Sequence, residues 1–135
     1  MGINTLSLKT LGISQQVEET GLTFQENSIL KATEYYSHSN IPTLADDSGL
    51  IVDVLNGNPG IRSARYAGNH ATDQQNRDKL LSELTTTPLH MRKAVFVCVI
   101  TVILQKNARK VFQGEINGNI AIKETGTMGF GYDSI

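Results

Sequence analysis

The sequence predicts an α/β fold, because helix-start signals alternate with apolar runs typical of strands. Two capping boxes, at residues 23–26 and 72–75, each place an acid or amide three residues after a threonine N-cap. The longest apolar run, residues 92–104, is rich in the β-branched residues that strands favour. The length of 135 residues fits one domain, which we expect to span residues 1–135.

Composition and charge exclude several classes of protein. The chain carries 12 Lys and Arg against 13 Asp and Glu, so no overall basic field attracts a nucleic-acid polymer. The longest apolar stretch, residues 94–104, is too short to span a membrane. The single cysteine, Cys98, excludes an internal disulfide and a cysteine zinc site. A free thiol in an apolar run fits a reducing compartment, most simply the cytoplasm.

The first elements can be predicted in chain order. Residues 4–11 alternate weakly between apolar and polar, as an edge strand does. A helix follows over residues 24–39, and it ends before Pro42 because the residue preceding a proline disfavours the helical conformation. The apolar stripe of this helix is made up of Ile29, Ala32, Thr33 and Tyr36.

Two adjacent carboxylates, Asp46 and Asp47, form the first candidate site. They lie between residues 43–45 and 50–54, which predict short buried strands, and a turn is expected between them at Ser48. Strand ends and the loops after them are where open α/β sheets place ligands. Neighbouring carboxylates repel, so a cation or a shared proton is expected there. A purely structural turn is the alternative.

The middle of the chain contains a turn, two arginines and a second helix. Residues 56–60 predict a tight turn, and residues 61–66 a loop or short helix. Arg62 and Arg65 either balance the nearby acids, bind phosphate or remain solvated. The second helix is predicted over residues 73–84 and packs through Leu80, Leu81 and Leu84.

The last part of the chain predicts strands followed by a glycine-rich loop. The strand over residues 92–104 is expected to pair with residues 111–116, and residues 120–122 predict another short strand. In the segment 126–135, glycines interleave with Phe130 and other residues. Glycine lets a backbone approach a ligand closely, and an aromatic ring on such a loop can stack on a planar base. A fraying terminus is the alternative.

These motifs, in this order, resemble the Ham1/inosine triphosphate pyrophosphatase family of non-canonical purine nucleoside triphosphate pyrophosphatases. The resemblance extends from about Gly12 to Ile135, and it is carried by residues 18–24, 26–32, 45–55, 59–66, 68–73 and 126–133. It implies a mixed central sheet with flanking helices and two lobes separated by a cleft. It also implies Mg²⁺-dependent hydrolysis of ITP, dITP and XTP to the monophosphate and pyrophosphate, which cleanses the nucleotide pool, and a homodimer.

The resemblance assigns roles to individual residues. Asp47 is the expected general base, and the expected Mg²⁺ ligands are Asp46, Asp47 and Glu18, with Glu19 as the alternative to Glu18. A triphosphate and these carboxylates repel each other unless a divalent cation bridges them. Lys31, which by itself indicates a solvated helix lysine, is expected to bind phosphate. The expected substrate contacts are Ser48, Lys31, Gly129, Phe130 (which stacks on the purine), Gly131, Tyr132 and Asp133.

The resemblance also predicts a fold that is incomplete at both ends. The family's N-terminal strand with its Ser/Thr-x-Asn-x-x-Lys phosphate loop has no counterpart here, nor has its C-terminal Ser-His-Arg motif with the following helix. Two alternative hypotheses follow. The chain is a shortened, catalytically weak or inactive member that acts as a nucleotide-binding or dimerising module, or it is a piece of a longer enzyme.

Overall fold

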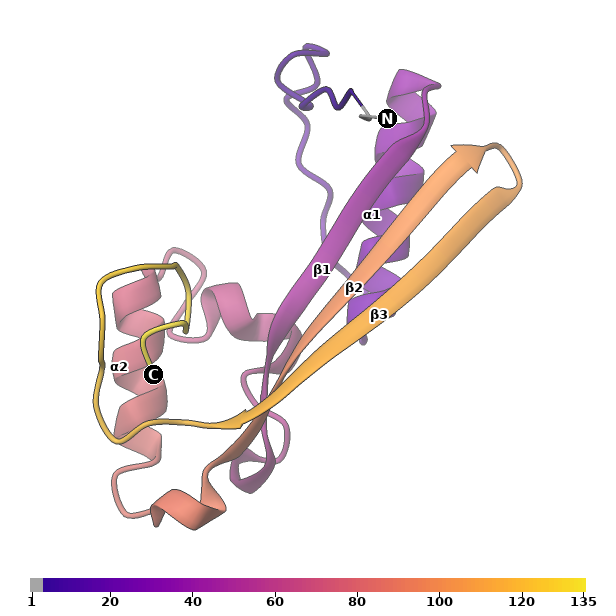
Figure 1. Ribbon diagram of the computed structural model, residues 1–135. Helices are drawn as coiled ribbons and strands as arrows, with labels where there is room; N and C mark the ends of the chain where they lie inside the picture. Colours follow the sequence, from indigo (N-terminus) through magenta and orange to yellow (C-terminus); the bar gives the residue numbers. More distant parts are fainter. Residues whose placement is uncertain (1–3) are drawn as a thin grey trace.

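The computed structural model describes residues 4–135, which form two lobes (Figure 1). One lobe is a long sheet with α1 (Phe24–Ser39) packed against it, and the other is built around α2 (Asp73–Glu83). The strands are β1 (Thr43–Val52), β2 (Lys93–Gln105) and β3 (Ala108–Asn119). Within residues 4–135, no helix is both long enough and apolar enough to cross a membrane.

The sheet has the order β1-β2-β3, and both strand pairs are antiparallel. The α/β class with flanking helices is therefore confirmed. The part of the sheet that the described residues form is antiparallel throughout, whereas the resemblance implies a mixed sheet. The predicted strand over residues 92–104 and its pairing with residues 111–116 are confirmed, and β3 is longer than expected.

The turn predicted at Ser48 is wrong, because β1 runs unbroken through Asp46 and Asp47. Gly49 serves close packing instead of a turn. A Cβ atom at Gly49 would lie 2.6 Å from Ser63 Oγ and 2.7 Å from the carbonyl oxygen of Gly60. Strand alternation then buries the Asp47 side chain and exposes that of Asp46. The two carboxylates consequently lie within an edge strand and not at its end.

The first helix has the predicted bounds and the predicted cap. Thr23 Oγ1 accepts from the backbone N–H of Glu26 at 3.1 Å, and Glu26 accepts from the backbone of Thr23 at 3.2 Å. The predicted stripe is wrong at Thr33, which is exposed. The buried side of α1 is made up of Phe24, Asn27, Ser28 and Ala32. Two of these are polar, so hydrophobicity alone places the stripe incorrectly.

Two predicted short strands are absent from the described residues. Residues 4–7 are irregular and residues 8–12 form a turn, in which Ser7 Oγ accepts from the backbone N–H of Thr10, a local bond that competes with strand pairing. Residues 120–122 do not form a strand, and backbone groups of Ile120 and Ala121 bond to Arg92 instead. Its carbonyl accepts from Ile120 at 2.9 Å, and its guanidinium donates to the carbonyl of Ala121 at 3.0 Å.

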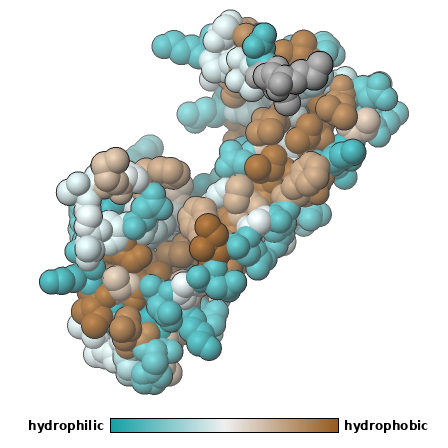
Figure 2. Space-filling model, viewed as in Figure 1, coloured by the Kyte–Doolittle hydropathy of each residue, from teal (hydrophilic) through white to brown (hydrophobic). Residues whose placement is uncertain are grey.

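The largest apolar cluster joins the end of the sheet to the second lobe. It combines strand residues with α2 and the C-terminal segment, and it contains Leu50, Val52, Leu80, Leu84, Ala94, Ile120 and Tyr132. The predicted packing of α2 through Leu80, Leu81 and Leu84 is confirmed, with Leu81 partly buried. Residues 60–65 form a short helix, one of the two alternatives predicted for residues 61–66. Figure 2 shows further hydrophobic side chains along the sheet.

Candidate functional site

A chain of ion pairs lies at the junction of α1, β1 and the short helix 60–65. Lys31 Nζ lies 2.8 Å from Asp47 Oδ1 and 2.8 Å from Glu19 Oε1. The other oxygen of Glu19, Oε2, accepts from Arg65 Nη1 at 3.0 Å. All four side chains line one cavity of about 330 Å³. Two carboxylates and two cations from four segments of the sequence therefore face the same space.

Buried Asn27 connects the segment that carries Glu19 to β1. Its Oδ1 accepts from the backbone N–H of Gly21 at 2.8 Å, and its Nδ2 donates to Asp47 Oδ2 at 3.4 Å. A Cβ atom at Gly21 would lie 2.6 Å from Asn27 Oδ1, so glycine is needed for this approach. One α1 residue thus bonds both to Asp47 and to the segment that carries Glu19.

Burial and mutual charge shift the pKa values of the three groups. Burial raises the pKa of Asp47, and the hydrogen bond from Lys31 offsets only part of that rise. Burial also acts to raise the pKa of Glu19, but the hydrogen bonds from Lys31 and Arg65 outweigh it and lower the pKa overall. Burial acts to lower the pKa of Lys31, and the hydrogen bonds to Asp47 and Glu19 raise it overall. The lysine is held charged beside a carboxylate with increased proton affinity, which suits a general base.

The predicted cluster of acids is only partly assembled around this cavity. Asp46, Asp47 and Ser48 all line it, and Ser48 Oγ donates to Asp46 Oδ2 at 3.2 Å. Strand alternation separates neighbouring side chains, but β1 is an edge strand, so a cavity can reach both of its faces. Glu18 is exposed and does not line the cavity, whereas Glu19 does. The structure therefore brings Glu19, and not Glu18, to Lys31.

The carboxylates fit a magnesium ion only if the substrate supplies further ligands. In the part of the chain from residue 4 onward, no three His, Cys, Asp or Glu side chains are grouped closely enough to hold a metal by themselves. Mg²⁺ commonly binds through one or two carboxylates, with waters and substrate phosphates completing its shell. Glu19 and Asp47 provide two such oxygen donors on the cavity wall.

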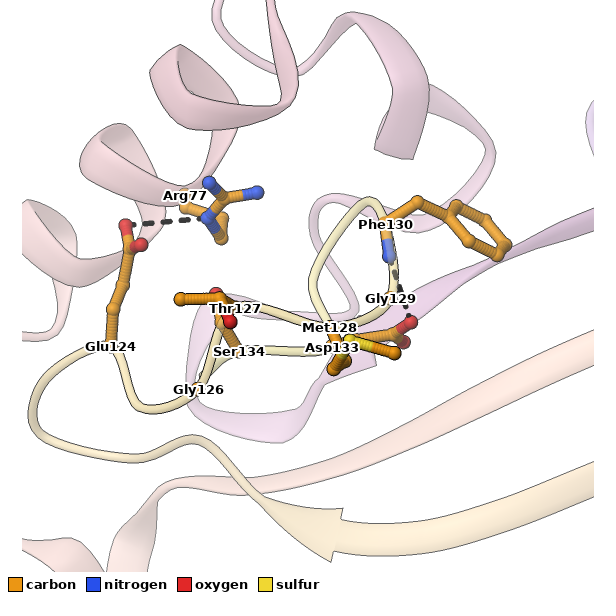
Figure 3. Close-up of a pocket in the computed structure, with 9 residues that line it drawn as sticks. All are labelled: Arg77, Glu124, Gly126, Thr127, Met128, Gly129, Phe130, Asp133 and Ser134. Carbon is orange, nitrogen blue, oxygen red and sulfur yellow. Dashed lines mark hydrogen bonds and ion pairs between the residues drawn. The ribbon is translucent and has the colours of Figure 1, made fainter.

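The C-terminal loop forms another wall of the same cavity. Phe130, Gly131, Tyr132 and Asp133 line it, while Gly129 lies in the adjoining smaller pocket. Figure 3 shows the Phe130 ring pointing away from the rest of its loop, and the side chain is 79% exposed. Asp133 Oδ2 accepts from the backbone N–H of Phe130 at 3.0 Å. A Cβ atom at Gly129 would lie 2.4 Å from Asp133 Oδ2, so this loop requires glycine there.

Tyr132 anchors the loop instead of presenting its hydroxyl to the cavity. Its ring is buried, and its hydroxyl donates to the carbonyl oxygen of Ser63 at 2.8 Å. Burial, together with the charge of Asp73, raises the pKa of Tyr132 to about 12. The hydroxyl consequently stays protonated and fixed at neutral pH.

Several residues of the site were not identified from the sequence. They are Asn27 and Ser63, which bond to β1, and Asp73 and Asn76, which bond to loops beside the cavity. Spacing offered a signal for Asn27 alone, because it is four residues before Lys31 and so lies on the same side of α1. The others meet the site only through tertiary contacts.

Comparisons with known proteins identify relatives along nearly the whole chain. Residues 1–135 match the Ham1 family. The chain is 50% identical over 137 residues to a dITP/XTP pyrophosphatase of Erwinia tasmaniensis and 46% identical over 130 residues to one of Geobacter sulfurreducens. These alignments cover 99% and 96% of this chain but only 66% and 65% of the relatives.

A solved structure agrees with these sequence relatives. The Ham1 protein of Staphylococcus aureus superposes with a TM-score of 0.88 at 47% identity, over 96% of this chain and 67% of that one. The chain thus spans about two thirds of the length of the proteins it matches.

Proposed function

The chain belongs to the Ham1 family, and on this premise we propose that it hydrolyses the non-canonical purine nucleoside triphosphates ITP, dITP and XTP to the monophosphate and pyrophosphate. The observation that carries the proposal is Lys31 held between Glu19 and Asp47 on the wall of a cavity that Phe130 also lines. The groups that act on the phosphates and the ring that contacts the base then line separate walls of one cavity. The relatives named dITP/XTP pyrophosphatase support the substrate class.

In the proposed reaction, Asp47 accepts the proton of the attacking water. Its raised pKa gives the carboxylate greater basicity than an exposed aspartate, and Asn27 holds its second oxygen. Lys31 donates to a phosphate oxygen of the substrate, since its ammonium group already lies in the cavity wall. Arg65 keeps Glu19 in place beside it.

We further propose that Mg²⁺ is the cofactor and that Glu19 and Asp47, with Asp46 beside them, hold it together with the substrate's phosphates. When bound, the ion neutralises phosphate charge during transfer. The support is the oxygen-only donor set on the cavity wall.

The purine is proposed to bind at the C-terminal loop. Phe130 supplies an exposed aromatic face for stacking, and stacking on such a face is worth about 1–3 kcal/mol per base. Ser48 contacts the substrate from β1. Gly129, Gly131, Tyr132 and Asp133 shape the pocket through the bonds that fix the loop.

Pyrophosphate release tests this function directly. The purified chain is incubated with ITP, with and without Mg²⁺, and with ATP and GTP as controls. Release that requires Mg²⁺ and favours ITP supports the proposal. A folded chain that binds ITP without turnover would instead be a nucleotide-binding module, and a chain that does neither would contradict both.

We also propose that the protein forms a homodimer through the face of the sheet opposite α1. Antiparallel register pairs the exposed Phe112 with Ile100 and the exposed Ile116 with Phe96, which leaves an apolar surface on that face. Sedimentation equilibrium is expected to give twice the mass of one chain, and Ile116→Lys is expected to give a monomer. A monomeric wild-type chain would contradict the proposal.

A further inference from the structure

The backbone of Gly131 is held by α2 at both its N–H and its carbonyl group. The backbone N–H of Gly131 donates to Asp73 Oδ2 at 2.8 Å. Its carbonyl oxygen accepts from Arg77 Nη1 at 2.7 Å. Asp73 and Arg77 are four residues apart and therefore lie on the same side of the helix. Together they form a clamp, which we call the Asp73–Arg77 clamp.

The guanidinium of the clamp is itself fixed by neighbours. Arg77 Nη2 donates to Gln74 Oε1 at 2.8 Å, and Arg77 Nε lies 3.2 Å from Glu124 Oε1 (Figure 3). Gln74 also donates to Glu124 at 2.6 Å. The guanidinium thus donates two hydrogen bonds through its Nη atoms and pairs in charge with Glu124 at Nε, which a lysine cannot reproduce because its ammonium is a single point of charge.

The clamp acts on the residue next to the proposed stacking ring. Phe130 is 79% exposed, so packing of its side chain does not determine its position. Its backbone N–H bonds to Asp133 within the same loop, which shapes the loop but does not attach it to the rest of the molecule. The bonds to Gly131 and the buried Tyr132 make that attachment. The clamp therefore fixes where the ring stands relative to Lys31 and Asp47.

We propose that Asp73 and Arg77 are positioning residues that set selectivity for the purine base by fixing Phe130 over the cavity. This inference rests on the proposed function. A flat ring held at a fixed distance from the phosphate-binding wall can stack on the base while the triphosphate of the same molecule reaches that wall. When the clamp is broken, the ring no longer keeps a fixed distance from Lys31 and Asp47, while the phosphate-binding wall itself stays intact.

The test compares base binding with phosphate binding in four variants. Asp73→Ala and Arg77→Met break the clamp, Asp73→Asn keeps an acceptor oxygen for Gly131, and Lys123→Met removes an exposed cation from the neighbouring segment as a matched control. The probes are ITP turnover, the affinity of inosine, and the affinity of inorganic tripolyphosphate, which has no base. Exchange of the Gly131 amide proton reports whether the clamp is open.

We expect the two breaking variants to raise the KM for ITP and weaken inosine binding by about ten-fold, the scale of one lost base-stacking contact. The kcat and the tripolyphosphate affinity stay within about two-fold of the wild type, because the Lys31 wall is unchanged. Asp73→Asn and Lys123→Met behave as the wild type. If Arg77→Met fails to fold, Arg77→Lys replaces it in the test. This variant is expected to show the same rise in KM for ITP and the same weaker binding of inosine.

Four outcomes would overturn the inference. Equal weakening of inosine and tripolyphosphate would show that the residues only support the fold. Unchanged KM for ITP despite rapid exchange at Gly131 would show that the loop position does not set selectivity. A wild-type chain that neither binds nor hydrolyses ITP refutes the proposed function and this inference with it. If the wild-type chain hydrolyses ITP and both breaking variants keep its ratio of inosine affinity to tripolyphosphate affinity, the inference is refuted and the proposed function stands.

Discussion

At the scale of single residues, the decisive contact is the one that Lys31 makes with two carboxylates. Its ammonium group lies 2.8 Å from an oxygen of Asp47 and 2.8 Å from an oxygen of Glu19. A partly buried lysine between two acids is held charged, and it lets two like charges remain close together. The arrangement places a cation and a base side by side, as phosphate hydrolysis requires.

Asp47→Asn is expected to abolish pyrophosphate release while leaving the fold intact. Asparagine keeps the size of the side chain but cannot accept the proton of water, and general-base catalysis typically contributes about 10²- to 10⁴-fold. Lys31 retains Glu19 as its partner. Turnover assays together with far-UV circular dichroism check the prediction, and full turnover in the variant would remove Asp47 from the role of base.

A pair of adjacent variants distinguishes the two glutamates. Glu19→Gln is expected to reduce Mg²⁺-dependent activity by about ten-fold or more, since even groups behind a metal's direct ligands cost about 10- to 100-fold when changed. Glu18→Gln is expected to leave activity near the wild-type value, because this side chain is exposed and does not line the cavity. Magnesium titrations of both variants provide the measurement. The reverse order of effects would return the metal role to Glu18.

Lys31→Met is expected to raise the pKa of Asp47 further. Burial already raises that pKa, and the lysine's hydrogen bond and charge now counteract part of the rise. A carboxyl whose pKa is raised on folding binds more protons in the folded state, so its contribution to stability falls as the pH increases through the folded pKa. The Lys31→Met variant should therefore lose more stability than the wild type as the pH rises from the unfolded to the folded pKa of Asp47. Carboxyl ¹³C titration measures the pKa, and an unchanged or lower value would contradict the prediction.

At the scale of elements, the continuity of β1 depends on the missing side chain of Gly49. Its backbone lies against the short helix 60–65, whose Ser63 Oγ accepts from the backbone N–H of Leu50 at 2.9 Å. This contact presses the strand onto the segment that carries Arg65. The strand and the short helix together therefore bring Asp47 and Arg65 to the same cavity.

Gly49→Ala is expected to destabilise the protein by about 1–3 kcal/mol, the usual cost of overpacking a filled site. The added methyl group would meet the carbonyl oxygen of Gly60 at 2.7 Å, and a backbone atom cannot rotate away. Gly114→Ala, within β3, is the matched control, because nothing lies within 4 Å of its added Cβ atom. Urea denaturation of both variants measures the difference. Equal stabilities would show that the strand can shift at Gly49.

At the scale of the whole molecule, Arg92 joins segments from both lobes. This residue is only 4% exposed. Its guanidinium donates to the carbonyl oxygens of Leu84 at 2.7 Å, Thr87 at 2.9 Å and Ala121 at 3.0 Å. These carbonyls belong to the end of α2, the connection to β2 and the segment after β3. One side chain thus ties the second lobe to the base of the sheet.

Arg92→Met is expected to reduce the free energy of unfolding by about 3 kcal/mol or more, because each buried group left without a partner costs about 1–3 kcal/mol. Methionine fills much of the volume but donates no hydrogen bond. Lys93→Met, at the exposed neighbouring position, is expected to change stability by no more than about 0.5 kcal/mol. Chemical denaturation checks both values, and a small effect at Arg92 would show that water replaces its bonds.

The sequence by itself determined the elements whose signals are local. Both capping boxes predicted their helices, since the bonding partners are three residues apart. The β-branched run predicted β2, because side-chain shape favours extended backbone at each position. Motif order predicted the family, and the comparisons confirm it. Each of these signals is complete within a short stretch of chain.

The tertiary structure alone decided how β1 continues, which glutamate meets Lys31, and what holds the Phe130 loop. Gly49 has the composition of a turn, and only Ser63 and Gly60 packing against it show why it lies in a strand. Glu18 and Glu19 are chemically equal, and the cations that select Glu19 lie 12 and 46 residues away. Such contacts depend on how distant segments meet, and no local pattern encodes that meeting.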